Sequence, residues 1–164
     1  MSGAANLDLE SAALRCAVED LYARYANTLD QERFDAWLDL FVEDCTYKVT
    51  ARENHARGLP LGVMAYESRG MLRDRVYGVQ NTLYHQPYYQ RHTISNFVIE
   101  AADESIHVEA NYSIIRTKRI GLSEVFNVGR YVDTLIWQDG ALRIKDKLCI
   151  YDSELIPNSL IYPI

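Results

Sequence analysis

Apolar and polar side chains alternate along the last third of the chain, from residue 129 to residue 152. In the final stretch, Leu142, Ile144, Leu148 and Ile150 are interleaved with Arg143, Lys145 and Lys147. The stretch before it carries an apolar set that we assign to the matching face: Phe126, Val128, Val132 and Ile136. This period of two is typical of half-buried antiparallel strands. The intervening Gln138-Asp139-Gly140 predicts a tight hairpin turn, because Asp and Gly tolerate positive φ.

Apolar residues in the first quarter recur at a spacing of three and four instead. Val18, Leu21, Tyr22, Tyr25 and Leu29 follow this spacing, as do Phe34, Trp37, Leu38 and Phe41. The pattern predicts an amphipathic helix over residues 8–30 and a shorter helix directly after it. Residues 42–50 then predict a short strand.

The middle of the chain predicts an irregular loop over residues 51–61, broken by Gly58 and Pro60, and a third helix over residues 64–79. Four long strands are expected afterwards, over residues 92–101, 105–118, 122–137 and 141–151. Helices followed by a strand meander predict an α+β domain, with the N-terminal helices packed on one face of a curved, mainly antiparallel sheet. We expect residues 1–164 to form a single domain.

Composition narrows the class of protein. A net charge of -6 and a pI near 5.2 argue against nucleic-acid binding, which needs a concentrated positive field. Cys16, Cys45 and Cys149 have no CxxC spacing, as is typical of reduced thiols in a cytoplasmic protein. The N-terminal residues resemble neither a signal peptide nor a membrane span, so we expect a cytoplasmic protein without membrane association.

The common motifs of catalysis and cofactor binding are missing from the sequence. His55, His85, His92 and His107 show no HExxH or CxH spacing that would indicate a metal site. There is also no glycine-rich nucleotide-binding turn and no GxSxG nucleophile elbow.

Two polar groups remain as candidates for chemistry in a pocket between helices and sheet. Asp146 falls on the apolar face of a regular final strand, where burial raises a carboxyl pKa and suits it to acid-base work. The alternative is a structural acid that pairs with an arginine or lies at a bulge. His92, with Tyr22 and Tyr25 opposite it, is suited to proton transfer. The alternative for His92 is a structural hydrogen-bond donor.

Several segments together resemble a known family. They are residues 21–49, residues 67–76 (ESRGMLRDRV), residues 91–100 (RHTISNFVIE) and residues 124–160. In these segments the chain resembles the small, β subunit of aromatic-ring-hydroxylating dioxygenases, the Rieske non-haem iron oxygenases. The loop NHARGLPLGV, residues 54–63, is most similar to subunits of enzymes that act on small aromatic acids such as terephthalate or halobenzoates.

The resemblance implies an NTF2-like, cystatin-like cone and a non-catalytic structural role. In such oxygenases a large α subunit holds the Rieske [2Fe-2S] cluster and the mononuclear Fe(II), and the assembly is α3β3. The α subunit hydroxylates the aromatic ring with O2 and with electrons from NADH, delivered by a reductase and sometimes a ferredoxin. This chain has neither the CxH and CxxH pair of a Rieske centre nor a two-histidine-one-carboxylate set. Suspected structural or interface residues are Arg91, His92, Asn96, Arg130, Asp133 and Asp146. Of these, we expect Arg91, His92 and Asn96 to order a strand start, and Arg130, Asp133 and Asp146 to form a charged ladder with Lys147.

The competing hypothesis is a stand-alone lyase or isomerase on the same fold, similar to scytalone dehydratase. Its candidate residues are Tyr22, Tyr25, Asp30, His92 and Asp146. Pocket occupancy separates the two hypotheses, because an enzyme keeps an open cavity while a scaffold can fill it. Seven bulky side chains favour a filled interior: Trp37, Phe41, Tyr47, Phe97, Tyr112, Phe126 and Trp137.

Overall fold

The structure, a computed structural model, describes residues 2–153 and 160–164, with side chains from Leu9 onward. Its helices are α1 (Ser2–Asp30), α2 (Phe34–Leu38), α3 (Arg52–Ala56) and α4 (Arg69–Asn81). Its strands are β1 (Phe41–Ala51), β2 (Met64–Tyr66), β3 (Tyr88–Ala102), β4 (Ser105–Lys118), β5 (Ser123–Gln138) and β6 (Ala141–Tyr151). The predicted α+β class is confirmed, and the bounds of β4 and β6 are those expected from the pattern.

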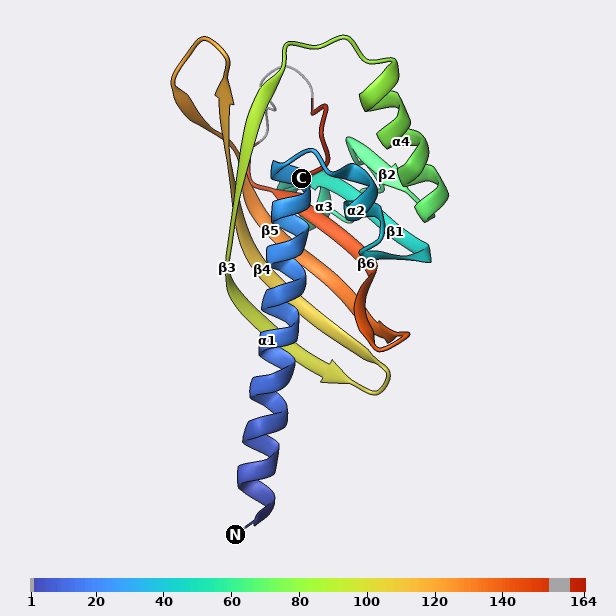
Figure 1. Cartoon of the computed structure of the whole chain (residues 1–164), viewed down its shortest axis with the longest axis vertical. Coiled ribbons are helices and arrows are strands. Elements are labelled where there is room, and N and C mark those ends of the chain that lie inside the picture. Colours follow the sequence, from blue (N-terminus) through green and yellow to red (C-terminus); the bar gives the residue numbers. More distant parts are fainter. Residues whose placement is uncertain (1, 154–159) are drawn as a thin grey trace.

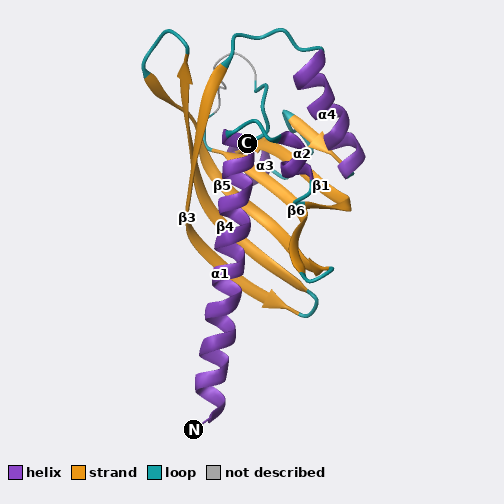
Figure 2. Cartoon of the chain, viewed as in Figure 1, coloured by secondary structure: helices purple, strands orange, loops and turns teal. Residues whose placement is uncertain are grey.

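One six-stranded sheet carries the fold, in the order β2-β1-β6-β5-β4-β3. The meander from β3 to β6 is antiparallel, as predicted, while β1 joins β6 in parallel. The long helix α1 lies across the inner side of the curved sheet, and α4 lies beyond it near β1 and β2 (Figures 1 and 2). In the part of the chain that the structure describes, no helix covers the other face of the meander.

A one-residue bulge in β6 changes which side chains point inward. Thr134 pairs with Asp146, but Leu135 pairs with Ile144, so Lys145 is an extra residue in the ladder. Because side chains alternate along a strand, one extra residue exchanges the two faces beyond it. The prediction that Asp146 faces the core is therefore wrong, and Lys147 takes the inner position.

The predicted inner face of β5 also needs correction. Tyr131, Asp133 and Leu135 are buried, whereas Val132 and Ile136, which alternate with them, are only partly buried. A register shift in the β4–β5 ladder accompanies this change. Both faces of β5 carry apolar residues, so the pattern alone does not identify the inner face. The buried Asp133 makes the inner face still less apparent, because carboxylates are seldom buried.

The segment between β1 and α4 differs from the expectation in two ways. Residues 51–61, predicted as a loop, contain the short helix α3 before Gly58 turns the chain at φ +65. Residues 64–66 form β2 instead of helix, and α4 begins only at Arg69. The side chain of Ser68 caps α4 by accepting a hydrogen bond from the main-chain N–H of Met71, at 3.2 Å.

Aromatic side chains fill the space between α1, α2 and the sheet. Five of the seven predicted fillers are buried: Trp37, Phe41, Tyr47, Tyr112 and Phe126. Phe97 is partly buried, with its ring centroid 5.2 Å from that of Tyr22. Trp137 is 55% exposed, so the prediction that it fills the interior is wrong. Among the described helices, none is both long enough and apolar enough to cross a membrane.

Candidate functional site

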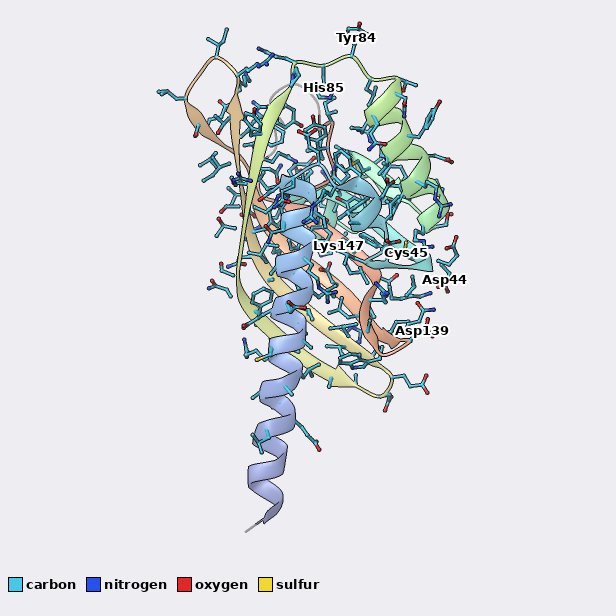
Figure 3. All side chains as sticks on the ribbon, viewed as in Figure 1. Asp44, Cys45, Tyr84, His85, Asp139 and Lys147 are labelled. Atoms are coloured by element: carbon cyan, nitrogen blue, oxygen red, sulfur yellow. The ribbon has the colours of Figure 1, made fainter. Side chains whose placement is uncertain are left out.

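The centre of the cone holds an ion pair between two strands. Asp133 of β5 and Lys147 of β6 are direct cross-strand partners, and Lys147 Nζ lies 2.8 Å from Asp133 Oδ2. Both side chains are fully buried. The hydroxyl of Tyr22 on α1 donates to the same carboxylate, and the main-chain N–H of Leu148 donates to Oδ1 at 3.2 Å. Figure 3 shows Lys147 in the interior beside α1. The carboxylate thus has a partner for each oxygen.

Tyrosine rings enclose the ammonium group of Lys147. Nζ lies 3.2 Å from the ring centroid of Tyr131, 4.4 Å from that of Tyr25 and 4.9 Å from that of Tyr22. Tyr131 is itself stacked on Tyr112, with centroids 4.3 Å apart. A cation over an aromatic face is attracted by the negative charge of that face, most strongly where water is excluded. The rings therefore offset part of the cost of removing the lysine from water.

The protonation states of these groups follow from their burial. Burial raises the pKa of the Asp133 carboxyl above its usual value, and the Lys147 ammonium is the largest of the influences that oppose this rise. Burial also raises the pKa of Tyr22, Tyr25 and Tyr131 well above that of free tyrosine. These tyrosines are therefore protonated at physiological pH, and the hydroxyls of Tyr22 and Tyr25 act as hydrogen-bond donors. The group is suited to holding α1, β5 and β6 together.

A second polar pair joins the end of α1 to β3. Nδ1 of His92 lies 2.6 Å from Asp30 Oδ1, and the main-chain N–H of His92 donates to Asp30 Oδ2 at 3.1 Å. Nε2 of His92 is buried and has no hydrogen-bond partner among the residues that the structure describes. Two of the five residues suspected under the lyase hypothesis, Asp30 and His92, therefore meet. Their contacts are those of a brace between helix and strand.

The remaining candidate residues lie apart from this interior. Arg91 is exposed, and Asn96 adopts φ +57 at a bulge in β3. Because β3 begins at Tyr88, Arg91 and Asn96 do not order a strand start as expected. Arg130 pairs with Glu109 at 3.4 Å on the exposed side of the sheet.

Asp146 accepts a hydrogen bond from Thr46 Oγ1 at 2.8 Å, outside the core. Of the two alternatives considered for Asp146, the structure supports the bulge, since Asp146 lies directly after the extra residue Lys145. Of the expected ladder of Arg130, Asp133, Asp146 and Lys147, only Asp133 and Lys147 pair with each other. The sequence does not predict this pair well, because Lys145, Asp146 and Lys147 are three consecutive charged residues. Which of them points into the core depends on the position of the bulge.

A cavity of about 760 Å³ lies beside the turn between β3 and β4. Leu14 of α1, Ile106 and Trp137 line it. Glu10, Asp103 and Glu104 also line it. It is separate from the buried pair and from the His92–Asp30 brace. In residues 2–153 and 160–164, no three His, Cys, Asp or Glu side chains converge in a way that could hold a metal ion.

The three thiols are expected to differ sharply in reactivity. Burial raises the pKa of Cys45 to about 11 and that of Cys149 to about 12, whereas Cys16 is exposed on α1. The thiolate is the reactive form, so at pH 8 the two buried thiols are ionised to about one part in a thousand or less. We expect one fast and two slow thiols in the folded chain, and three fast thiols in denaturant. A thiol-reactive chromophore followed over time measures this, with Cys16→Ser as the control that removes the fast phase. A second fast thiol in the folded chain would contradict the expectation.

The fold and its interior define an NTF2-like cone that is packed with its own side chains around a structural ion pair. The chain belongs to the ring-hydroxylating dioxygenase β-subunit family, because the family model described as "Ring hydroxylating beta subunit" matches residues 24–158. The chain is therefore a subunit of an aromatic-ring-hydroxylating dioxygenase, and the stand-alone lyase hypothesis is not favoured.

Individual relatives agree with this family. The chain is 37% identical to the small subunit of anthranilate 1,2-dioxygenase from Burkholderia cepacia, over 88% of this chain and 90% of that protein. It is 29% identical to a β subunit of the terephthalate 1,2-dioxygenase terminal oxygenase component from Comamonas, over 87% and 93%. A solved structure from Novosphingobium aromaticivorans, "beta subunit of a putative aromatic-ring-hydroxylating dioxygenase", has a TM-score of 0.86 and 37% identity, covering 94% of this chain and 99% of that one.

Proposed function

We propose that this chain is the non-catalytic, structural β subunit of an oxygenase that hydroxylates an aromatic acid. The family match over residues 24–158 carries the proposal. The relatives named for anthranilate and terephthalate support an aromatic acid as the substrate class. The filled interior supports a structural role, since the tyrosines and the ion pair occupy the space in which an NTF2-like enzyme would hold a substrate.

The catalytic groups are assigned to a partner α subunit, together with which this chain forms an α3β3 assembly in the cytoplasm. The α subunit carries the Rieske [2Fe-2S] cluster and the mononuclear Fe(II), and it receives electrons from a reductase, directly or through a ferredoxin. The described part of this chain has no converging set of ligands that fits either group. Its contribution to the reaction is therefore to position and stabilise the α subunits that bind the metals.

Co-expression with the α subunit tests the proposal. We expect the two chains to co-purify in equal numbers, with iron and ring-hydroxylating activity in the complex. The isolated chain should fold but should contain no stoichiometric iron and should show no activity toward anthranilate, benzoate or terephthalate. Metal analysis and oxygen uptake with NADH and the reductase are the measurements. Iron or oxygenase activity in the isolated chain, or full activity of the α subunit without this chain, would refute the structural role.

A further inference from the structure

Residues 160–164 lie inside the cone and are separated from β6 by the chain outside the described residues. In Figure 1 this segment approaches the end of α1 from above. Leu160 is 9% exposed, Tyr162 4% and Ile164 0%, while Ile161 between them is only partly buried. The segment belongs to no strand of the sheet. Its main chain therefore has to find partners other than a β-ladder.

Side chains from four elements supply those partners. Tyr25 of α1 donates its hydroxyl to the main-chain oxygen of Ile164 at 2.5 Å, and the hydroxyl of Tyr47 on β1 accepts from the N–H of Ile164 at 2.9 Å. Cys149 of β6 lies 3.5 Å from the same oxygen. Arg75 of α4 donates to the main-chain oxygen of residue 161 at 2.6 Å and to that of residue 160 at 3.1 Å. Side-chain recognition of an extended main chain is the way in which a receptor holds a bound peptide.

The side chain of Tyr162 occupies an aromatic slot at the mouth of the cone. Its ring centroid lies 4.8 Å from that of Tyr88, 5.2 Å from that of His85 and 5.6 Å from that of Phe34. These three residues come from β3, from the connection before it and from α2. A buried aromatic anchor in a pocket is the usual source of affinity in a binding site.

The deep part of this binding surface has packing of its own that does not involve the segment. Trp37 contacts Phe41 and Tyr47, with ring centroids 4.9 and 5.8 Å apart, and Tyr25 lies 6.3 Å from Trp37. Tyr25 also contacts Lys147 and Tyr131 of the central cluster. We therefore expect the aromatic wall to remain when the segment is removed, with the hydroxyls of Tyr25 and Tyr47 and the guanidinium of Arg75 within reach of a ligand. A wall that is already in its bound geometry loses little entropy on binding.

We propose that the mouth of the cone is a peptide-binding socket, occupied in cis by residues 160–164, and that it accepts the peptide Leu-Ile-Tyr-Pro-Ile when that segment is removed. The ligand class is an extended apolar peptide with an aromatic anchor two residues before an aliphatic one. The segment thus acts as a built-in ligand that closes the cone to other molecules.

Peptide binding to a chain that lacks residues 160–164 tests the proposal. We expect the truncated chain to bind fluorescently labelled Leu-Ile-Tyr-Pro-Ile in an anisotropy titration. For a peptide with a Kd of about 10 μM, the full chain should bind about 100-fold more weakly, because a tethered segment competes at an effective concentration on the order of 1 mM. In the truncated chain, Tyr47→Phe should weaken binding by a factor on the order of ten or more, because it removes both hydrogen bonds that the hydroxyl makes to the main chain of residue 164. Tyr66→Phe is the matched control that should leave the affinity unchanged, since the Tyr66 ring lies 6.2 Å from that of Tyr47 and, within the described residues, its hydroxyl makes no hydrogen bond to the segment.

Several outcomes would overturn the socket. A truncated chain that is folded by circular dichroism but does not bind the peptide would do so, and so would equal binding of the scrambled peptide Pro-Ile-Leu-Ile-Tyr. If the truncated chain does not fold, Tyr162→Ala in the full chain replaces it. Added peptide should then raise the melting temperature of Tyr162→Ala in a concentration-dependent way and leave the unmutated chain unchanged. No rise for Tyr162→Ala would equally overturn the proposal.

Discussion

Replacing Lys147 by alanine is expected to lower the free energy of unfolding by about 3–5 kcal/mol, because it leaves the Asp133 carboxylate buried without its counter-charge. Both side chains are fully buried and 2.8 Å apart, so the substitution leaves the carboxylate away from bulk solvent without a charged partner. The Tyr131 ring, 3.2 Å from Nζ, would also lose its cation. Urea unfolding followed by circular dichroism, with the midpoint and slope both fitted, measures the loss.

Two further variants decide whether the buried charge is the cause. Lys145→Ala is the matched control two residues earlier on β6, where the ammonium pairs with exposed Asp44 at the surface. It should cost far less, because exposed pairs contribute little. Combining Lys147→Met with Asp133→Leu should recover most of the loss, since an apolar pair of similar volume carries no desolvation penalty. A Lys147→Ala chain as stable as Lys145→Ala would show that the pair does not hold the core.

The hairpin and the first helix could be predicted because each depends on local chemistry. The bounds of β6 follow from alternation that starts directly after Asp139 and Gly140, which adopt φ +52 and +74 in the structure. Two consecutive residues at positive φ are the geometry of the favoured two-residue hairpin turn. The stripe of apolar residues on α1 likewise predicts both the helix and its buried face. Such features need no knowledge of distant parts of the chain.

The inward direction of Lys147 could not be predicted, because it depends on a bulge whose position is set by two neighbouring strands. β6 pairs with β5 on one side and with β1 in parallel on the other, and both ladders shift register near Lys145. The parallel pairing of β1, far away in sequence, leaves no mark on the alternation of β6. For the same reason Asp146 was assigned to the wrong face.

The family of this chain could be predicted from resemblance along most of its length, whereas the contacts of individual site residues could not. Resemblance over most of the chain predicted the family, which the model match at residues 24–158 confirms. It could not place single side chains. The brace between Asp30 and His92 joins residues 62 positions apart, and the segment at 160–164 meets Tyr25 and Tyr47 from more than 110 positions away. Contacts of that range are decided by the packing of the whole cone.

Gly129→Ala is expected to prevent stable folding, with a loss of at least about 3 kcal/mol in the free energy of unfolding. Gly129 lies opposite Tyr151 in the β5–β6 ladder. A Cβ at this position would lie 2.1 Å from the main-chain oxygen of Ile150 and 2.8 Å from Cα of Tyr151. These are main-chain atoms, so no side-chain rotation can relieve the overlap, and the strands would have to separate.

Gly78→Ala in α4 is the matched control for this substitution. Its added Cβ would meet only Thr82 Oγ1, at an ordinary 3.7 Å, and Gly78 lies inside a helix. Alanine there should raise stability by about 0.5–1 kcal/mol, because glycine loses more conformational freedom on folding. Soluble yield and the urea midpoint of the two variants, each compared with the unmutated chain, give the result. A Gly129→Ala chain with an unchanged midpoint would mean that β5 and β6 do not approach each other as closely as the ladder requires, and the inward placement of Lys147 would have to be revised with it.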